Sequence, residues 1–302
     1  MALTLSNTNA EASHYLSINQ SKLQRSLKKL SSGKKLVDPT DDPGGLAVSM
    51  KLQASLNRLS SAQRNVQNGI SFLEVQDGLL DTVGKIVTRM SELKGLASQD
   101  PLKGTDDIAS YNNEFKDLQV QLYSMSRQKF NGVSLFGAEG KTFNRGSTSA
   151  SDFSLVSIHA SAEGSSGPKI SIHKAMLASA LMIKSDGTAG ATSSDLNFAA
   201  EEVGDALEIT NSSISIGTIN GVIDNIAYLR SQNGGSASRL AFAAQNLAQQ
   251  QTNLSAALGR IEDVDIAAET ANLAKYMILT QASASMVAQA NSVNEIALML
   301  LR

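Results

Sequence analysis

LQASLNRLSSAQRNVQNGISFLEVQDGLL, residues 52–80, repeats apolar side chains at alternating intervals of four and three residues. Side chains with this spacing lie on one face of a helix and predict a partner helix. From Leu79 the stripe shifts to a parallel line that ends at Ala97, so we expect one helix over about 45–98. The first line consists of Leu52, Leu56, Leu59, Gln63, Val66, Ile70, Leu73, Asp77 and Leu80; the second includes Val83, Ile86, Met90 and Leu93.

The preceding segment predicts a separate helix over about 9–32, with a leucine stripe. Gly33 then provides a left-handed cap, because glycine adopts a positive φ at little cost. Asp42 followed by Pro43 predicts the N-cap and first residue of the long helix.

Downstream, apolar periodicity predicts a third helix over about 105–127, capped by Thr105 or Asp106. The pattern then alternates with a period of two around 153–158 and 170–172, which indicates a β-hairpin within 141–183. Residues 184–205 are rich in Ser, Thr, Gly and Asp and predict a loop with one short helix. Helix returns near Ile214 and is expected to run to the C-terminus, with a soft point at Gly234–Gly235.

These elements predict a mainly α fold: an elongated antiparallel helical bundle or coiled-coil rod made from both termini, with a small β-hairpin in the middle. We expect an inner domain of residues 1–44 and 262–302. A rod domain would comprise 45–183 and 206–261, with 184–205 as a short variable loop. The basic run 22–35 would then lie near the acidic run 262–269.

Composition narrows the possible functions. The net charge of −2 gives no general attraction to nucleic acid, and there is no cysteine for disulfide or thiol chemistry. The N-terminus resembles no cleaved signal peptide, and no window is apolar enough for membrane insertion. The sequence contains no phosphate-binding loop and no nucleophile elbow. None of the three histidines, His14, His159 and His173, has a second ligand at the spacing of a metal site. We therefore expect no enzyme activity, no catalytic residue, no cofactor and no metal.

Four stretches together resemble the bacterial flagellins, and they occur in the family's order and at the family's two ends. They are LSSGKKLVDPTDDPGGLAVSMKLQASL (30–56), RNVQNGISFLEVQDGLL (64–80), QKFNGVSLF (128–136) and GRIEDVDIAAETANLAKYMILTQASASMVAQAN (259–291). The resemblance covers about 1–140 and 210–302.

The resemblance implies a structural subunit that polymerises into the extracellular flagellar filament used for swimming. It also implies export of the unfolded chain by the flagellar type III system, with an export chaperone, a cap protein and hook–filament junction proteins as partners. The family's outer variable domains are nearly absent here. Terminal segments too weak to fold alone would become ordered when they pack against other copies.

The resemblance further suggests which residues carry assembly. For the inner layer we expect Leu16, Leu23, Leu27, Leu30, Val287, Ile296, Leu298 and Leu301; the alternative is that they form only an intramolecular core. In some flagellins a vertebrate Toll-like receptor binds the second domain, where the matching positions are Arg89, Leu93 and Glu114. Ser91 stands where such flagellins often carry arginine, and the same face also suits contacts between subunits.

Two other functions remain open at this stage. A hook–filament junction protein shares flagellin-like termini, and a soluble secreted coiled-coil effector or adhesin would never polymerise. The serine-rich stretch 147–171 would accept O-linked sugars if exposed, or serve as a flexible turn.

Overall fold

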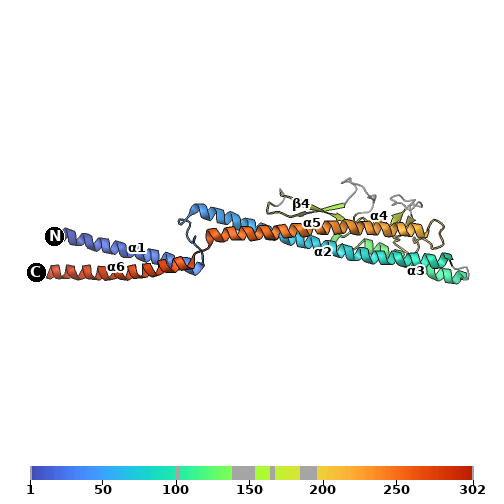
Figure 1. Cartoon of the computed structure of the whole chain (residues 1–302). Coiled ribbons are helices and arrows are strands. Elements are labelled where there is room, and N and C mark those ends of the chain that lie inside the picture. The colour runs from blue at the N-terminus through green and yellow to red at the C-terminus, as the bar shows by residue number, and fades with distance from the viewer. Residues whose placement is uncertain (1, 100–102, 138–153, 164–166, 184–195, 301–302) are drawn as a thin grey trace. The chain divides into compact units, whose positions relative to one another are not determined.

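The structure is a computed structural model that describes residues 2–99, 103–137, 154–163, 167–183 and 196–300 (Figure 1). Side chains near both termini, 2–9 and 294–300, lie outside the described part. The chain forms two compact units. Unit 1 consists of Met1–Asn57 and Gln251–Arg302, and unit 2 of Arg58–Gln250. Both limits fall inside long helices rather than at residues 44 and 262, where the sequence predicts domain limits.

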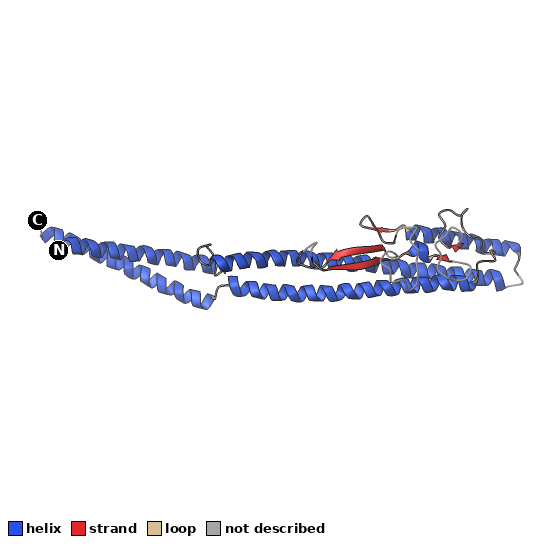
Figure 2. Cartoon of the chain, turned by 90° about the horizontal axis from the view of Figure 1, so that it is seen from above, coloured by secondary structure: helices blue, strands red, loops and turns tan. Residues whose placement is uncertain are grey.

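Helices dominate both units, which confirms the predicted mainly α fold (Figure 2). The helices are α1 (Ala2–Ser32), α2 (Pro43–Gln99), α3 (Thr105–Ser126), α4 (Leu177–Ala180), α5 (Ile216–Glu262) and α6 (Ile266–Leu300). Within the described residues, six short strands form three antiparallel pairs. They are β1 (Lys129–Phe130) with β2 (Val133–Ser134), β3 (Ser154–His159) with β4 (Lys169–Lys174), and β5 (Met182–Ile183) with β6 (Leu196–Asn197).

The ends of the helices follow from local chemistry. Gly33 has a φ of +69° after α1, as predicted for a left-handed cap. At the start of α2, the Gly45 amide donates a hydrogen bond to Oδ1 of Asp42 (2.9 Å), which confirms the predicted N-cap. At α3 the prediction was wrong by one residue. Gly104 is the N-cap, and its amide donates to the Asp107 carboxylate (3.1 Å).

Three expectations about helix length need correction. The first helix begins at Ala2 rather than near Asn9. The last helix is interrupted between Glu262 and Ile266, because the Asp265 carboxylate accepts the amides of Ala267 (2.9 Å) and Ala268 (3.1 Å) and so caps a new helix. In contrast, α5 continues through Gly234–Gly235. The adjacent Asn233 is buried and donates to the carbonyl of Leu73 (2.8 Å), which holds the helix in place.

The seam of α2 differs from the predicted one at three positions. Leu59, Val66, Leu73 and Leu80 are buried as expected. Ala62, Gly69 and Gln76 are buried in place of Gln63, Ile70 and Asp77, whereas Val83 and Met90 of the second predicted line are buried as expected. A Cβ on Gly69 would lie 2.1 Å from Cδ1 of Ile158, so the glycine lets the predicted β3–β4 hairpin approach the helix closely.

The core of unit 2 lies between α2, α3, α5 and the strands. Its largest fully buried side chains include Phe115, Phe136 and Phe198. Side-chain amides also anchor the irregular segment before α5. Gln119 donates to the carbonyl of Leu207 and accepts its amide (both 2.9 Å), and Asn112 accepts the amide of Ile209 (2.7 Å). Buried backbone groups are thereby satisfied without regular structure.

Part of the predicted middle region lies outside the described residues. These are 138–153, 164–166 and 184–195, which include most of the expected variable loop and part of the serine-rich stretch. Within the described part, β3 pairs with β4 from Ser154↔Lys174 to His159↔Lys169, which confirms the hairpin. The pairs β1–β2 and β5–β6 were not predicted.

Candidate functional site

The helices α1 and α6 run antiparallel in unit 1, with both chain termini at the same end of the pair (Figures 1 and 2). Covered positions recur along both helices at intervals of four and three residues, as in a coiled coil. On α1 they are Ala12, Leu16, Asn19, Leu23, Ser26 and Leu30; on α6 they are Leu273, Tyr276, Thr280, Ser283, Val287 and Ala290. We call these twelve positions the terminal seam.

The terminal seam is polar at its centre. Nδ2 of Asn19 donates a hydrogen bond to Oγ of Ser283 (2.9 Å), and the ammonium of Lys22 lies 5.8 Å from the centre of the Tyr276 ring. A polar residue at such a position fixes the register of two helices but reduces the stability of their pairing. Half-buried leucines flank this polar centre, so the two helices pair through apolar contacts on either side of it while the polar contacts set their register.

Large apolar side chains of α6 lie outside the terminal seam. Ile278 is 69% exposed and Met286 is 65% exposed. Leu279, Met286 and Val293 follow one another at intervals of seven residues, so they line one flank of the helix. We call these three residues the α6 stripe. On α1, Tyr15 and Leu27 are also exposed.

Unit 1 has no apolar core of its own within the described part. Every fully buried apolar side chain that the structure describes lies between Leu59 and Leu247, in unit 2. In unit 1, the buried side chains among the described residues are those of Ser26 and Ser49. A helix pair that leaves its larger apolar residues in water is a surface suited to contact with other chains.

The structure sorts the predicted assembly residues into three groups. Leu16, Leu23, Leu30 and Val287 are half-buried in the terminal seam, whereas Leu27 is 49% exposed. Ile296 and Leu298 belong to α6, but their side chains lie outside the described part, as does Leu301. Sequence reasoning missed the α6 stripe, although its spacing of seven residues was a visible signal. Stronger leucine repeats elsewhere in the chain obscured it.

The predicted approach of the basic and acidic runs is confirmed at one pair. Nζ of Lys34 lies 2.8 Å from the Glu262 carboxylate, and this hydrogen bond lowers the pKa of Glu262. The backbone supports it, because the amide of Lys35 donates to the carbonyl of Glu262 (2.5 Å) and the amide of Val264 to that of Gly33 (3.0 Å). These contacts hold the α1–α2 loop against the α5–α6 break.

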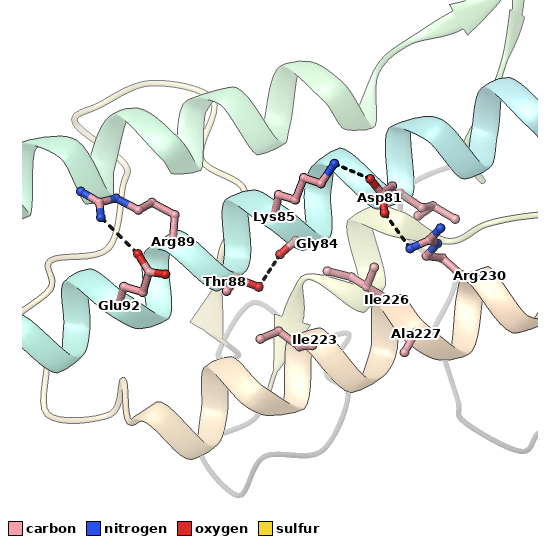
Figure 3. Close-up of a pocket in the computed structure, with 11 residues that line it drawn as sticks. Asp81, Gly84, Lys85, Thr88, Arg89, Glu92, Ile223, Ile226, Ala227 and Arg230 are labelled. Atoms are coloured by element: carbon pink, nitrogen blue, oxygen red, sulfur yellow. Dashed lines mark hydrogen bonds and ion pairs between the residues drawn. The ribbon is translucent and has the colours of Figure 1, made fainter.

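Unit 2 carries a second candidate surface, a groove of about 430 Å³ between α2 and α5 (Figure 3). Its floor is apolar, with Leu80, Ile223 and Ile226, and Gly84 leaves space above it. Its rim is charged. Arg230 contacts Asp77 (3.0 Å) and Asp81 (2.8 Å), and Asp81 also accepts from Lys85 (2.7 Å).

The ion pairs continue along α2 toward α3. Arg89 contacts Glu92 (3.1 Å) and Glu114 (2.8 Å), and hydrogen bonding to Glu114 raises the pKa of its guanidinium. The expectation that Arg89, Leu93 and Glu114 share one surface fails at Leu93. Leu93 is fully buried because it faces the core of unit 2, so it is not available to a partner of the folded chain.

The described residues contain no cluster of three or more side chains suited to holding a metal ion. Among the helices within the described ranges, none is both long and apolar enough to cross a lipid bilayer.

Comparisons with known proteins agree with this arrangement. Residues 5–141 match the bacterial flagellin N-terminal helical region, and residues 216–301 match the bacterial flagellin C-terminal helical region. The chain is 32% identical to a flagellin of Halalkalibacterium halodurans over 95% of its own length and 94% of the relative's. The chain belongs to the bacterial flagellin family. A Bacillus subtilis flagellin is 32% identical, with 95% of both chains covered. A flagellar filament 30.7 kDa core protein of Treponema maltophilum is 30% identical, with 93% of both covered.

As a flagellin, the chain is a structural subunit of the bacterial flagellar filament, an extracellular polymer. Because the matches cover 93% or more of each of these relatives, none of the three carries a large middle domain that this flagellin lacks.

Proposed function

We propose that this flagellin joins the filament through unit 1, with the α6 stripe packed against the terminal helices of neighbouring subunits. The observation that carries the proposal is the lack of a buried apolar core among the described residues of unit 1. Fully burying one such side chain contributes about 1.5–3 kcal/mol, and since the three residues of the stripe are only partly exposed in the single chain, we expect them to add a few kcal/mol in total to the contact. The exposed Tyr15 and Leu27 would extend the contact onto α1.

The same arrangement accounts for growth as an open polymer. A patch on one copy that meets a different patch on the next makes a heterologous contact, which gives a helical filament where the rotation does not close. The α6 stripe runs along one flank of the terminal seam on α6. The seam can therefore pair within the subunit while the stripe pairs between subunits. The role is structural, with no catalytic step.

A stripe exposed before assembly also needs protection. We extend the proposal to the partners that the family implies: an export chaperone that covers the C-terminal helix, type III export of the unfolded chain, and a cap protein that guides folding at the tip. Hook–filament junction proteins would receive the first subunits. Because the terminal seam is polar at Asn19 and Ser283, separating the two helices for export costs little.

The groove on unit 2 is the second proposed contact surface between subunits. An apolar floor within a charged rim is the common composition of a protein interface. Arg89 and Glu114 lie at the end of this rim, so a vertebrate Toll-like receptor, where it recognises the chain, would bind the same surface. Leu93 would take no direct part while unit 2 remains folded.

The test is electron microscopy of purified chains mixed with filament seeds. The test variant replaces Leu279, Met286 and Val293 with Ser. The control variant replaces Gln281 and Ala288, which are exposed on the side of α6 opposite the stripe, with Ser. We expect filaments from the unmodified chain and the control, and none from the test variant.

Circular dichroism should show the same helix content in both variants, because the changed side chains are exposed in the single chain. Normal filaments from the stripe variant would overturn the role of the α6 stripe. If even the unmodified chain stayed soluble with seeds, a soluble coiled-coil function would replace filament formation.

A further inference from the structure

The sequence contains four Asn–Gly pairs, at Asn68, Asn131, Asn220 and Asn233. In such a pair the glycine nitrogen can attack the carbonyl carbon of the asparagine side chain. A new C–N bond forms, ammonia leaves, and the resulting succinimide ring is opened by water to aspartate or isoaspartate. Glycine favours the attack because it has no Cβ to obstruct the approach. Whether a given pair reacts depends on its backbone conformation.

Three of the four pairs lie inside helices. Asn68–Gly69 is in α2, and Asn220–Gly221 and Asn233–Gly234 are in α5. There each glycine amide is held by the carbonyl four residues earlier, and the helix keeps its nitrogen from turning toward the preceding side chain. Asn233 is further restrained, since its side chain is buried and donates to the carbonyl of Leu73.

The fourth pair forms the tip of the β1–β2 hairpin. Phe130 pairs with Val133, so Asn131 and Gly132 are the two residues of the turn. Both have positive φ angles, +49° and +79°, as in a type I′ turn. The hydrogen bond that closes such a turn uses the amide of the residue after the glycine, so the turn itself does not hold the attacking nitrogen. Both residues are exposed to water, the second reactant.

We propose that Asn131 is a site of spontaneous deamidation, distinguished from the three other Asn–Gly pairs by the backbone around it. Aspartate would add a negative charge at the hairpin tip. Isoaspartate would add a carbon atom to the backbone of a two-residue turn, whose length sets the pairing of Lys129 with Ser134. The change lies close to the core, because Phe130 makes an edge contact with Phe72 and the following Leu135 is buried.

The experiment follows all four sites in the full chain at once. Purified protein is held at mildly alkaline pH, samples are digested at intervals, and mass spectrometry measures the fraction of each asparagine converted. A parallel sample is held unfolded in urea. In the folded chain we expect Asn131 to lose its amide while Asn68, Asn220 and Asn233 keep theirs. In urea all four should be converted.

Asn220 is the matched comparison, because it is exposed like Asn131 but lies in a helix. Conversion of Asn220 as fast as Asn131 in the folded chain would overturn the proposal. So would an Asn131 that stays intact in the folded chain while the unfolded sample reacts. An Asn131→Gln variant should remove the converted peptide from the digest and leave the other three unchanged.

Discussion

Unit 2 and unit 1 are both helical, yet the first is completed by its own chain and the second is not. Unit 2 buries Phe115, Phe136 and Phe198 and anchors its irregular segments with side-chain amides. Unit 1 pairs two helices through a half-buried seam that is polar at its centre, and it leaves Ile278 and Met286 in water. The difference teaches that helix formation and core formation are separate problems, since unit 1 forms long helices without a buried apolar core among its described residues.

The largest effect is expected when a buried side chain in the core of unit 2 is truncated. Phe115 is fully buried, so Phe115→Ala should lower the free energy of unfolding by roughly 3–5 kcal/mol. Phe242 lies on α5 with 69% of its surface exposed, and Phe242→Ala should change it by less than about 0.5 kcal/mol. Urea unfolding followed by circular dichroism checks both. Equal losses would mean that the core of unit 2 is not where the structure places it.

A smaller loss of stability is expected from a substitution where the β3–β4 hairpin packs against α2. Gly69→Ala would place a methyl group against the terminal Cδ1 atoms of Ile158 and Leu240, which must shift, and we expect the overpacking cost of about 1–3 kcal/mol to outweigh the helix-propensity gain of about 1 kcal/mol. At Gly78, also in α2, a Cβ meets nothing within 4 Å, so Gly78→Ala should stabilise the chain by about 1 kcal/mol through helix propensity. Opposite shifts of the melting temperature are expected. A stabilising Gly69→Ala would contradict the close approach of the hairpin.

The difference between the two units should become smaller if the polar centre of the terminal seam is made apolar. Replacing both Asn19 and Ser283 with Leu should stabilise the pairing of α1 with α6 by about 2 kcal/mol, because two more side chains become partly buried. Hydrogen exchange of α6 amides in the single chain should slow accordingly. The control places Leu at Gln20 and Gln281, which are exposed. Similar protection in both variants would show that the seam is not where α1 and α6 meet.

The smallest expected effect is a loss of stability at acid pH. The ordinary pKa of a glutamate is 4.5, and the hydrogen bond from Lys34 holds that of Glu262 lower in the folded chain. The unfolded chain therefore binds more protons between the two values, so this stabilisation is present above about pH 4.5 and lost as the pH falls further. Lys34 is 56% exposed, which limits the contribution to less than about 1 kcal/mol.

The acid effect is measured as the loss of helix content of the single chain during an acid titration. Lys34→Gln should remove the part of the pH dependence that belongs to Glu262, whereas Lys28→Gln, at an exposed position of α1, should leave it in place. Identical titrations of the two variants would exclude a role for the Lys34–Glu262 pair.

The sequence by itself determined the mainly helical fold, the caps at Gly33 and Asp42, and the family. Apolar periodicity located α2 and α3, Gly33 and Asp42 marked helix ends, and alternation located β3 and β4. Each of these signals is local, since a cap or a period depends on a few neighbouring residues. The flagellin-like stretches at both ends predicted a filament subunit for the same reason, because they can be recognised without knowing what they contact.

Only the tertiary structure decided which side of each helix meets the rest of the chain. Periodicity alone did not separate the seam through Gln63 and Asp77 from the one through Ala62 and Gln76, because residues three and four positions after a buried residue both lie next to it, on opposite sides. The close approach of Ile158 to Gly69 settles it. Likewise, only packing shows that Leu93 is buried while Leu279 and Met286 are exposed. Whether a side chain is buried depends on which residues pack against it, and the whole fold sets the position of those residues.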